Sequence, residues 1–266
     1  MAVPRRWVLQ AGLVTGLLSA CGSEVFKAIP TPVAAPGKTP VSTPNAGVTD
    51  LSRNRPPAAV RNGYTPAVEV EHGNRGSANV VLSFQGSGDA RIARDMLHEA
   101  ERAHVRVTVL AVGTWLLAHP FIAHRILHGG HELGNQTYSH PADLARLSPD
   151  AAYEEIARCA TVLRKLTGTP GTWFRTTGSP HASNMVLTQA GRAGYAHCLS
   201  YDVETTDWTD PGAAHIVAAV DKVQHGSVIS LHLGHAGTLA ALPQILDHLR
   251  QKGLTPVTAG EMFGLT

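Results

Sequence analysis

Apolar and polar residues follow two different spacings along the chain after about residue 76. Short runs rich in Val, Ile, Leu and Ala alternate with longer segments in which apolar residues recur every three or four positions. The first spacing predicts strands and the second predicts helices. Seven strands are predicted at residues 80–84, 105–112, 132–135, 172–175, 195–200, 227–232 and 254–258. The predicted helices include residues 89–103, 120–128, 149–167, 213–223 and 239–252.

Helices separate nearly all of these predicted strands. Such alternation implies parallel strands joined by right-handed crossovers. Seven strands within residues 76–266 predict an α/β fold, a distorted and incomplete (β/α)7 barrel, with an open doubly wound sheet as the alternative. No Gly-x-Gly-x-x-Gly turn follows the first strand, which disfavours a dinucleotide-binding form of that alternative.

Residues 1–20 have the pattern of an export signal. Arg5 and Arg6 precede an apolar run that is too short to span a bilayer and that ends at Ala20. The Cys21 that follows resembles the lipidated cysteine of bacterial lipoproteins. We therefore expect an exported lipoprotein that begins at lipidated Cys21 and is anchored to the membrane, facing the cell envelope. An ordinary cleaved signal followed by an unrelated cysteine is the alternative.

Residues 21–75 contain many Pro, Ala, Thr and Gly residues and no sustained apolar spacing. This composition predicts a disordered tether between the anchor and a domain at residues 76–266. The formal net charge is only +2 and no basic run is present, so nucleic acid is not expected as a partner. Cys159 and Cys198 could form a disulfide or remain buried thiols, and the sequence leaves both possibilities open.

Chemically useful side chains follow several of the predicted strands. In parallel α/β folds, functional sites gather at the carboxyl ends of the strands. Here those ends carry Gln85 with Gly86, residues 135–140, Arg175, residues 201–208 and His232. Any one of these residues could be an ordinary solvated loop residue, but their joint placement predicts a cleft at one end of the barrel.

Three stretches carry a family resemblance. "GGHELGNQTYSHPADLARLS", "DVETTDW" and "GSVISLHLG" are similar to the second, fourth and fifth motifs of polysaccharide deacetylases, carbohydrate esterase family 4. The resemblance implies a barrel of the polysaccharide deacetylase type. It also implies a divalent metal, usually zinc, held by one Asp and two His, with a second Asp as base and a late His as acid.

The first half of that motif set departs from the family pattern. Gln85 stands where the resemblance places the base Asp, and Gly86 stands where it places the metal-binding Asp. Gln136 replaces the first metal-binding His, so His140 is the one remaining ligand of the three. One imidazole should bind zinc weakly, so no cofactor is expected and zinc is predicted to be weakly bound or absent.

The later half of the motif set is kept. The resemblance implies that His232 and Asp207 are the catalytic pair, and that Trp208, Arg175 and Gln85 contact the substrate. Of the third motif only Arg175 remains.

Two main hypotheses follow. The favoured one is a non-catalytic envelope lipoprotein that still binds N-acetylated polysaccharide or peptidoglycan, with its deacetylase activity lost or much reduced. The alternative is an active hydrolase of amide or ester bonds that uses His232, Asp207 and a displaced metal. Asp89, His181 or His235 would then supply substitute ligands. A structural envelope protein without a ligand is a third hypothesis.

Overall fold

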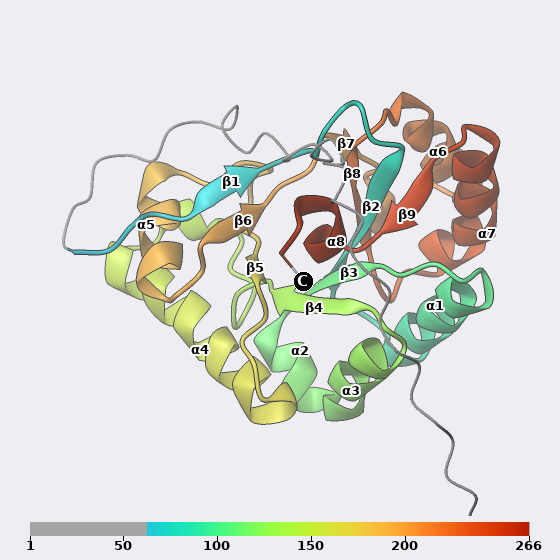
Figure 1. Cartoon of the computed structure of the whole chain (residues 1–266). Helices are drawn as coiled ribbons and strands as arrows, with labels where there is room; N and C mark the ends of the chain where they lie inside the picture. The colour runs from blue at the N-terminus through green and yellow to red at the C-terminus, as the bar shows by residue number, and fades with distance from the viewer. Residues whose placement is uncertain (1–62, 266) are drawn as a thin grey trace, which may run out of the picture. The chain divides into compact units, whose positions relative to one another are not determined.

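Nine parallel strands form one curved sheet in the computed structural model, which describes residues 63–265 (Figure 1). The order across the sheet is β1-β6-β5-β4-β3-β2-β8-β7, and β9 also pairs with β2. The strands are β1 (Val68–Val70), β2 (Asn79–Gly86), β3 (Thr108–Ala111), β4 (Glu132–Asn135), β5 (Trp173–Phe174), β6 (His197–Leu199), β7 (Val203–Glu204), β8 (Val228–His232) and β9 (Thr255–Val257).

The sheet curls into an incomplete barrel, as predicted. Its two outer strands, β1 and β7, do not pair with each other in this order. An isolated antiparallel bridge between His72 and Ser227 spans part of the opening, where the Gly73 amide donates to the Gly226 carbonyl at 2.7 Å. The predicted fold class, a distorted (β/α)7-type barrel, is confirmed, although the structure adds two short strands to the seven predicted ones.

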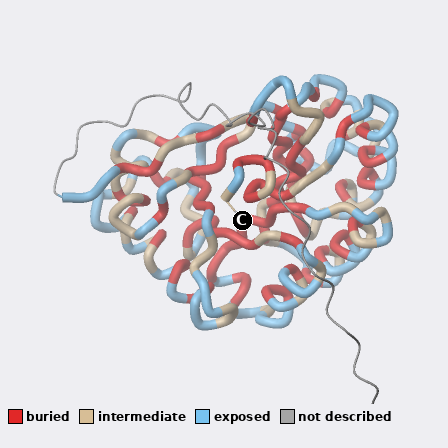
Figure 2. Tube along the Cα trace, in the orientation of Figure 1, coloured by how far each residue is buried: buried red, intermediate tan, exposed pale blue. Residues whose placement is uncertain are grey.

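Helices cover the outside of the barrel (Figure 2), and local sequence signals set many of their ends. Asp89, Ser148, Ser183 and Thr258 cap α1, α4, α5 and α8 through their side chains. Gly168 ends α4 in the left-handed conformation. The helices are α1 (Ala90–Arg102), α2 (Gly113–Ala118), α3 (Pro120–His128), α4 (Pro149–Thr167), α5 (Asn184–Arg192), α6 (Ala213–Ala219), α7 (Ala236–Gln251) and α8 (Ala259–Phe263).

The helix α8 plugs the amino-terminal end of the barrel (Figure 1). Its Met262 and Phe263 pack in one cluster with strand residues such as Val81 and Trp173. The buried carboxylate of Glu132 accepts hydrogen bonds from Trp173 Nε1 at 2.9 Å and from the Gly260 amide at 3.0 Å. Because this end is filled, the opposite, carboxyl end is where the barrel can hold a ligand.

Some sequence expectations fall on residues that the structure does not describe. The signal at residues 1–20, Cys21 and most of the tether lie outside residues 63–265. The predicted end of the tether at residue 75 needs correction. Strand β1 pairs with β6 at one edge of the sheet and therefore belongs to the domain. No helix among the described residues combines the length and apolarity needed to cross a membrane.

The two described cysteines are free thiols. Both are buried, in different hydrophobic clusters. Burial raises the pKa of each thiol to about 12. Of the two possibilities that the sequence left open, the structure shows buried thiols and no disulfide between them.

Candidate functional site

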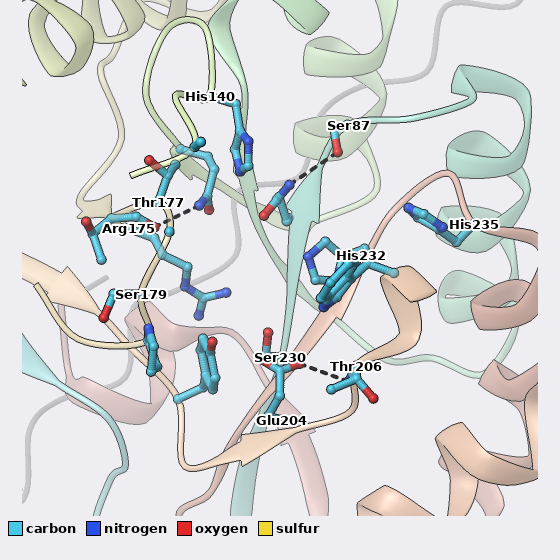
Figure 3. A pocket seen from close by; sticks show the side chains of 18 residues that line it. Ser87, His140, Arg175, Thr177, Ser179, Glu204, Thr206, Ser230, His232 and His235 are labelled. Carbon is cyan, nitrogen blue, oxygen red and sulfur yellow. Dashed lines mark hydrogen bonds between the residues drawn. The ribbon is translucent and has the colours of Figure 1, made fainter. Parts of the chain in front are cut away.

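A cleft of about 730 Å³ opens at the carboxyl ends of the strands (Figure 3). His140, Arg175 and His232 reach it from the ends of three different strands, β4, β5 and β8. The lining residues are Gln85, Ser87, Gln136, His140, Ala142, Arg175, Thr176, Thr177, Gly178, Ser179, Pro180, Tyr201, Glu204, Thr206, Trp208, Ser230, His232 and His235. The predicted convergence of these strand ends is therefore observed.

His232 and Asp207 form a hydrogen-bonded pair at one wall. Asp207 Oδ1 accepts from His232 Nδ1 at 2.8 Å. Asp207 Oδ2 accepts from the His232 backbone amide at 2.8 Å and from Thr238 Oγ1 at 2.6 Å. This geometry fixes the imidazole so that Nδ1 carries the hydrogen toward Asp207, which leaves Nε2 as the free ring nitrogen.

The carboxyl group of Asp207 is fully buried but stays ionised. Burial alone would raise its pKa, but the hydrogen bonds from His232 and Thr238, with the charge of His232, outweigh burial and hold the pKa below the ordinary value. The turn around it is conformationally demanding, since Thr206 and Asp210 have φ values of 51°. A backbone held in this region is often found at functional sites.

A loop after β4 carries Gln136 and His140 on the opposite side of the cleft. Thr137 and His140 adopt positive φ values of 68° and 56°. Burial, followed by the charge of His232, lowers the pKa of His140. Glu155 of α4 fixes the loop by accepting from the amides of Tyr138 and Ser139 at 3.1 and 2.8 Å. The imidazole of His140 is therefore held neutral and facing the cleft.

Gln85 and Gly86 occupy the last two positions of β2 and face in opposite directions. Gln85 lies in register with His232 and lines the cleft, where its Nε2 donates to Ser87 Oγ at 3.4 Å. Gly86 does not line the cleft. A Cβ added at Gly86 would lie 2.9 Å from both the Cα and the Cβ of Ala111 in β3. With this backbone, a side chain at position 86 would begin against β3 rather than in the cleft.

Comparison with known proteins settles the family. Residues 72–197 match the family model described as polysaccharide deacetylase. The chain is 30% identical over 214 residues to a peptidoglycan-N-acetylglucosamine deacetylase of Bacillus cereus. The aligned region covers 76% of this chain and 77% of that protein. The chain belongs to the polysaccharide deacetylase family. It is also 28% identical over 173 residues to a chitooligosaccharide deacetylase of Bradyrhizobium, over 64% of this chain and 77% of that protein.

Solved structures of this family share the fold. The peptidoglycan N-acetylglucosamine deacetylase Bc1960 superposes with a TM-score of 0.68 at 28% identity, over 74% of this chain and 94% of that one. BA3943, a family pseudoenzyme from Bacillus anthracis, superposes with a TM-score of 0.69 at 21% identity, over 75% of this chain and 70% of that one. At that identity the second likeness concerns the fold alone.

Family membership corrects one expectation. Deacetylases of carbohydrate esterase family 4 are metal-dependent, with zinc or cobalt, so the expectation of no cofactor is wrong for this family. The side chains at the family's ligand positions nevertheless fit such an ion poorly. Of the three, His140 offers an imidazole, Gly86 offers no donor atom, and Gln136 offers an amide. Within residues 63–265, no three His, Cys, Asp or Glu side chains gather closely enough to hold an ion.

Gln136 is nearly inaccessible and only half satisfied. Its Nε2 donates to the Thr176 carbonyl at 3.0 Å, which turns Oε1 the other way. This oxygen is buried and has no donor among the described residues, and the same holds for the hydroxyl of the neighbouring Thr177. A buried polar atom without a partner costs free energy. This wall of the cleft is therefore less completely bonded than the Asp207 wall.

Arg175 and Trp208, two other predicted site residues, differ in how far the protein itself already binds their side chains. Arg175 lines the cleft, but Nε donates to the Leu199 carbonyl and one Nη donates to Ser83 Oγ, both at 2.8 Å. Burial lowers its pKa to about 10. Trp208 is 55% exposed at the cleft, which rules out a core role. Arg175 therefore supports the walls of the cleft, whereas Trp208 is open to a ligand.

The three residues considered as substitute ligands do not gather at one point. Asp89 caps α1 and bonds Arg91, and it does not line the cleft. His181 lies 3.3 Å from Glu69 of β1, also outside the lining. His235 alone lines the cleft, with its Nδ1 3.5 Å from Asp210.

Tyr201 and Glu204 also line the cleft, although no role was predicted for Tyr201. Burial, with the charge of Glu204, raises the pKa of the Tyr201 hydroxyl. Its position directly after the predicted strand at residues 195–200 was the available signal, since residues at that place face the carboxyl end of the barrel.

Proposed function

We propose that this family member binds N-acetylated polysaccharide of the cell envelope, and that its ability to hydrolyse the amide bond is lost or much reduced. One observation carries the proposal. Both oxygens of Asp207 are bonded and hold His232 at one wall of the cleft, while Gln85 takes the position of the base at the strand beside it.

The loss of hydrolysis follows from the chemistry of Gln85. A general base must accept a proton from the attacking water, and a carboxamide has almost no affinity for a proton near neutral pH. His232 lines the cleft where a leaving amine would need a proton, and Asp207 holds its ring in place through Nδ1. Without a base to activate water, however, this acid has no preceding step to complete.

The binding role follows from the side chains that remain free. The exposed face of Trp208 suits stacking on the apolar face of a sugar ring. His232 Nε2 and the Gln85 amide can exchange hydrogen bonds with hydroxyl and acetamide groups. The named substrates of the relatives, peptidoglycan N-acetylglucosamine and chitooligosaccharide, support an N-acetylated glycan as the ligand.

The place of action rests on the sequence alone. Cys21 after an export signal supports an exported protein anchored to the membrane by lipid. Intact mass of the protein from cell membranes should show acylation at Cys21, and Cys21→Ala should abolish both the acyl mass and membrane fractionation. Recovery of the unmodified wild-type protein from the soluble fraction would reject the anchor.

Calorimetry with chitotetraose tests the binding role. We expect measurable binding that Trp208→Ala weakens about tenfold, through loss of one stacking contact. Phe121→Ala, which removes an aromatic side chain that is 53% exposed and lies outside the cleft lining, is the matched control and should leave affinity unchanged. Equal affinity in the wild type and Trp208→Ala would contradict the proposal.

The Asp207–His232 pair favours one alternative, an active hydrolase. Acetate release from chitotetraose or N-acetylated peptidoglycan, abolished by His232→Ala, would establish it. Binding without acetate release is the outcome expected from our proposal.

A further inference from the structure

A second concavity lies behind the loop that carries His140. It is a groove of about 430 Å³ along one face of α4. Leu117 of α2 and Tyr138 of the loop form one side, and residues of α4 that include Tyr153, Arg158 and Lys165 form the other. None of the residues assigned to the cleft lines this groove.

The loop at residues 136–140 is the partition between the two concavities. Gln136 and His140 line the cleft, whereas Tyr138 between them lines the groove. The loop is held by α2, since the amides of Gly113 and Thr114 donate to the carbonyls of Thr137 and Tyr138 at 3.0 and 2.8 Å. The loop therefore contributes residues to both the cleft and the groove.

The charged side chains that line the groove favour an anionic ligand. Its lining contains two cations, Arg158 and Lys165, and one carboxylate, Glu154. Within residues 63–265 neither cation forms an ion pair, and the Arg158 guanidinium instead lies 3.7 Å from the centre of the Tyr138 ring. Two exposed cations without carboxylate partners, beside apolar and aromatic side chains, suit a ligand that combines sugar rings with negative charge.

We propose that this groove is a subsite for the carboxylate-bearing continuation of a glycan strand bound in the cleft. The inference rests on the proposed glycan binding and goes further, because it specifies the ligand class. The preferred polymer carries carboxylates on its side groups, as peptidoglycan does on its peptides or, where these are removed, on its lactyl groups, and a neutral chitin-type chain lacks them. Lys165 and Arg158 would attract those carboxylates beyond the His140 loop.

The experiment compares two ligands of equal length on the full-length protein in detergent micelles. One is chitotetraose, and the other is a peptidoglycan tetrasaccharide with free lactyl carboxylates. We expect the carboxylate-bearing ligand to bind about threefold to tenfold more tightly at low salt, within the range of a few exposed ion pairs, and the preference to shrink as salt is added.

Lys165→Gln should lower this preference about twofold to fourfold, the contribution of one exposed ion pair, while the affinity for chitotetraose stays unchanged. Lys165→Arg should retain the preference. Lys222→Gln, which changes an exposed lysine outside both concavities, is the matched control and should have no effect. Arg158→Gln provides a second variant, which removes the other cation.

The outcomes separate the two proposals. Equal affinity for both ligands, or a preference unchanged by both Lys165→Gln and Arg158→Gln, would reject the groove subsite. If Trp208→Ala still weakened chitotetraose in that case, the cleft would remain a glycan site. Failure of both tetrasaccharides to bind the wild type would reject the cleft proposal together with the groove.

Discussion

The two walls of the cleft differ in how completely their polar atoms are bonded. At the β8 wall, both oxygens of Asp207 are used, by the ring and amide of His232 and by Thr238. At the β4 wall, Gln136 and Thr177 each keep a buried oxygen without a donor. At β2, between these walls, Gly86 turns away from the cleft. The comparison indicates that the wall with Asp207 and His232 is held in a fully bonded geometry, whereas the wall with Gln136 is not.

Breaking the bonded wall should have the largest effect. Asp207→Ala leaves the Thr238 hydroxyl and two N–H groups of His232 without their acceptor in a buried place, which should lower the free energy of unfolding by about 3 kcal/mol or more. Urea denaturation measures this change. Asp247→Asn alters a carboxylate that is 63% exposed and should cost under about 0.5 kcal/mol. Similar midpoints for both variants would contradict the comparison.

Position 86, at the end of β2 between the two walls, provides a second test. Gly86→Asp forces a side chain against the backbone and side chain of Ala111, and such overpacking typically costs about 1–3 kcal/mol. Gln85→Asp places the same carboxylate in the open cleft and should cost less than half as much. Thermal denaturation of the two variants checks the order. A Gly86→Asp protein as stable as the wild type would show that the end of β2 can rearrange and restore a side chain to the cleft.

Local sequence signals predicted much of the fold. The helix at residues 120–128 and the strand at 132–135 occur with the predicted bounds, because Pro120 and the Gly129–Gly130 pair mark their ends. The strands β1 and β7 were missed. They have three and two residues, too few for any periodicity, and they exist through pairing with distant strands.

The site was predicted through its residue types but not through its geometry. The family motifs pointed to His232 and Trp208, which line the cleft, and to Asp207, which is buried and bonded to His232. The direction of position 86 depends on the register of β2 against β3, which no local pattern encodes. Arg175 donates hydrogen bonds to Ser83 and Leu199, which lie far from it in the sequence. These bonds could therefore not be predicted from the sequence either.

Acid should weaken the bonded wall only below about pH 4. The pKa of Asp207 is lower in the folded protein than its ordinary value of 3.8. A lowered carboxyl pKa stabilises the fold above the unfolded value, and this contribution is lost as the pH falls from about 4 through the folded pKa. Asp207→Asn should remove that part of the pH dependence, which urea denaturation between about pH 5 and pH 2 would measure. An unchanged slope in the variant would contradict the assignment.

The smallest effect is expected at His140, on the less completely bonded wall. Burial lowers its pKa below the ordinary 6.5, so the unfolded chain takes up a proton more readily than the folded one. Stability from this group is present above about pH 6.5 and is lost as the pH falls through the folded pKa.

Burial lowers the pKa of His131 and His197 as well, so the wild type should lose stability gradually below about pH 6.5. His140→Asn should reduce that slope only in part, because His131 and His197 keep their own contributions. Unfolding midpoints collected from pH 7 to pH 5 would test the order. A His140→Asn protein with the full wild-type slope would show that the imidazole titrates freely in solvent and is not held neutral by the cleft.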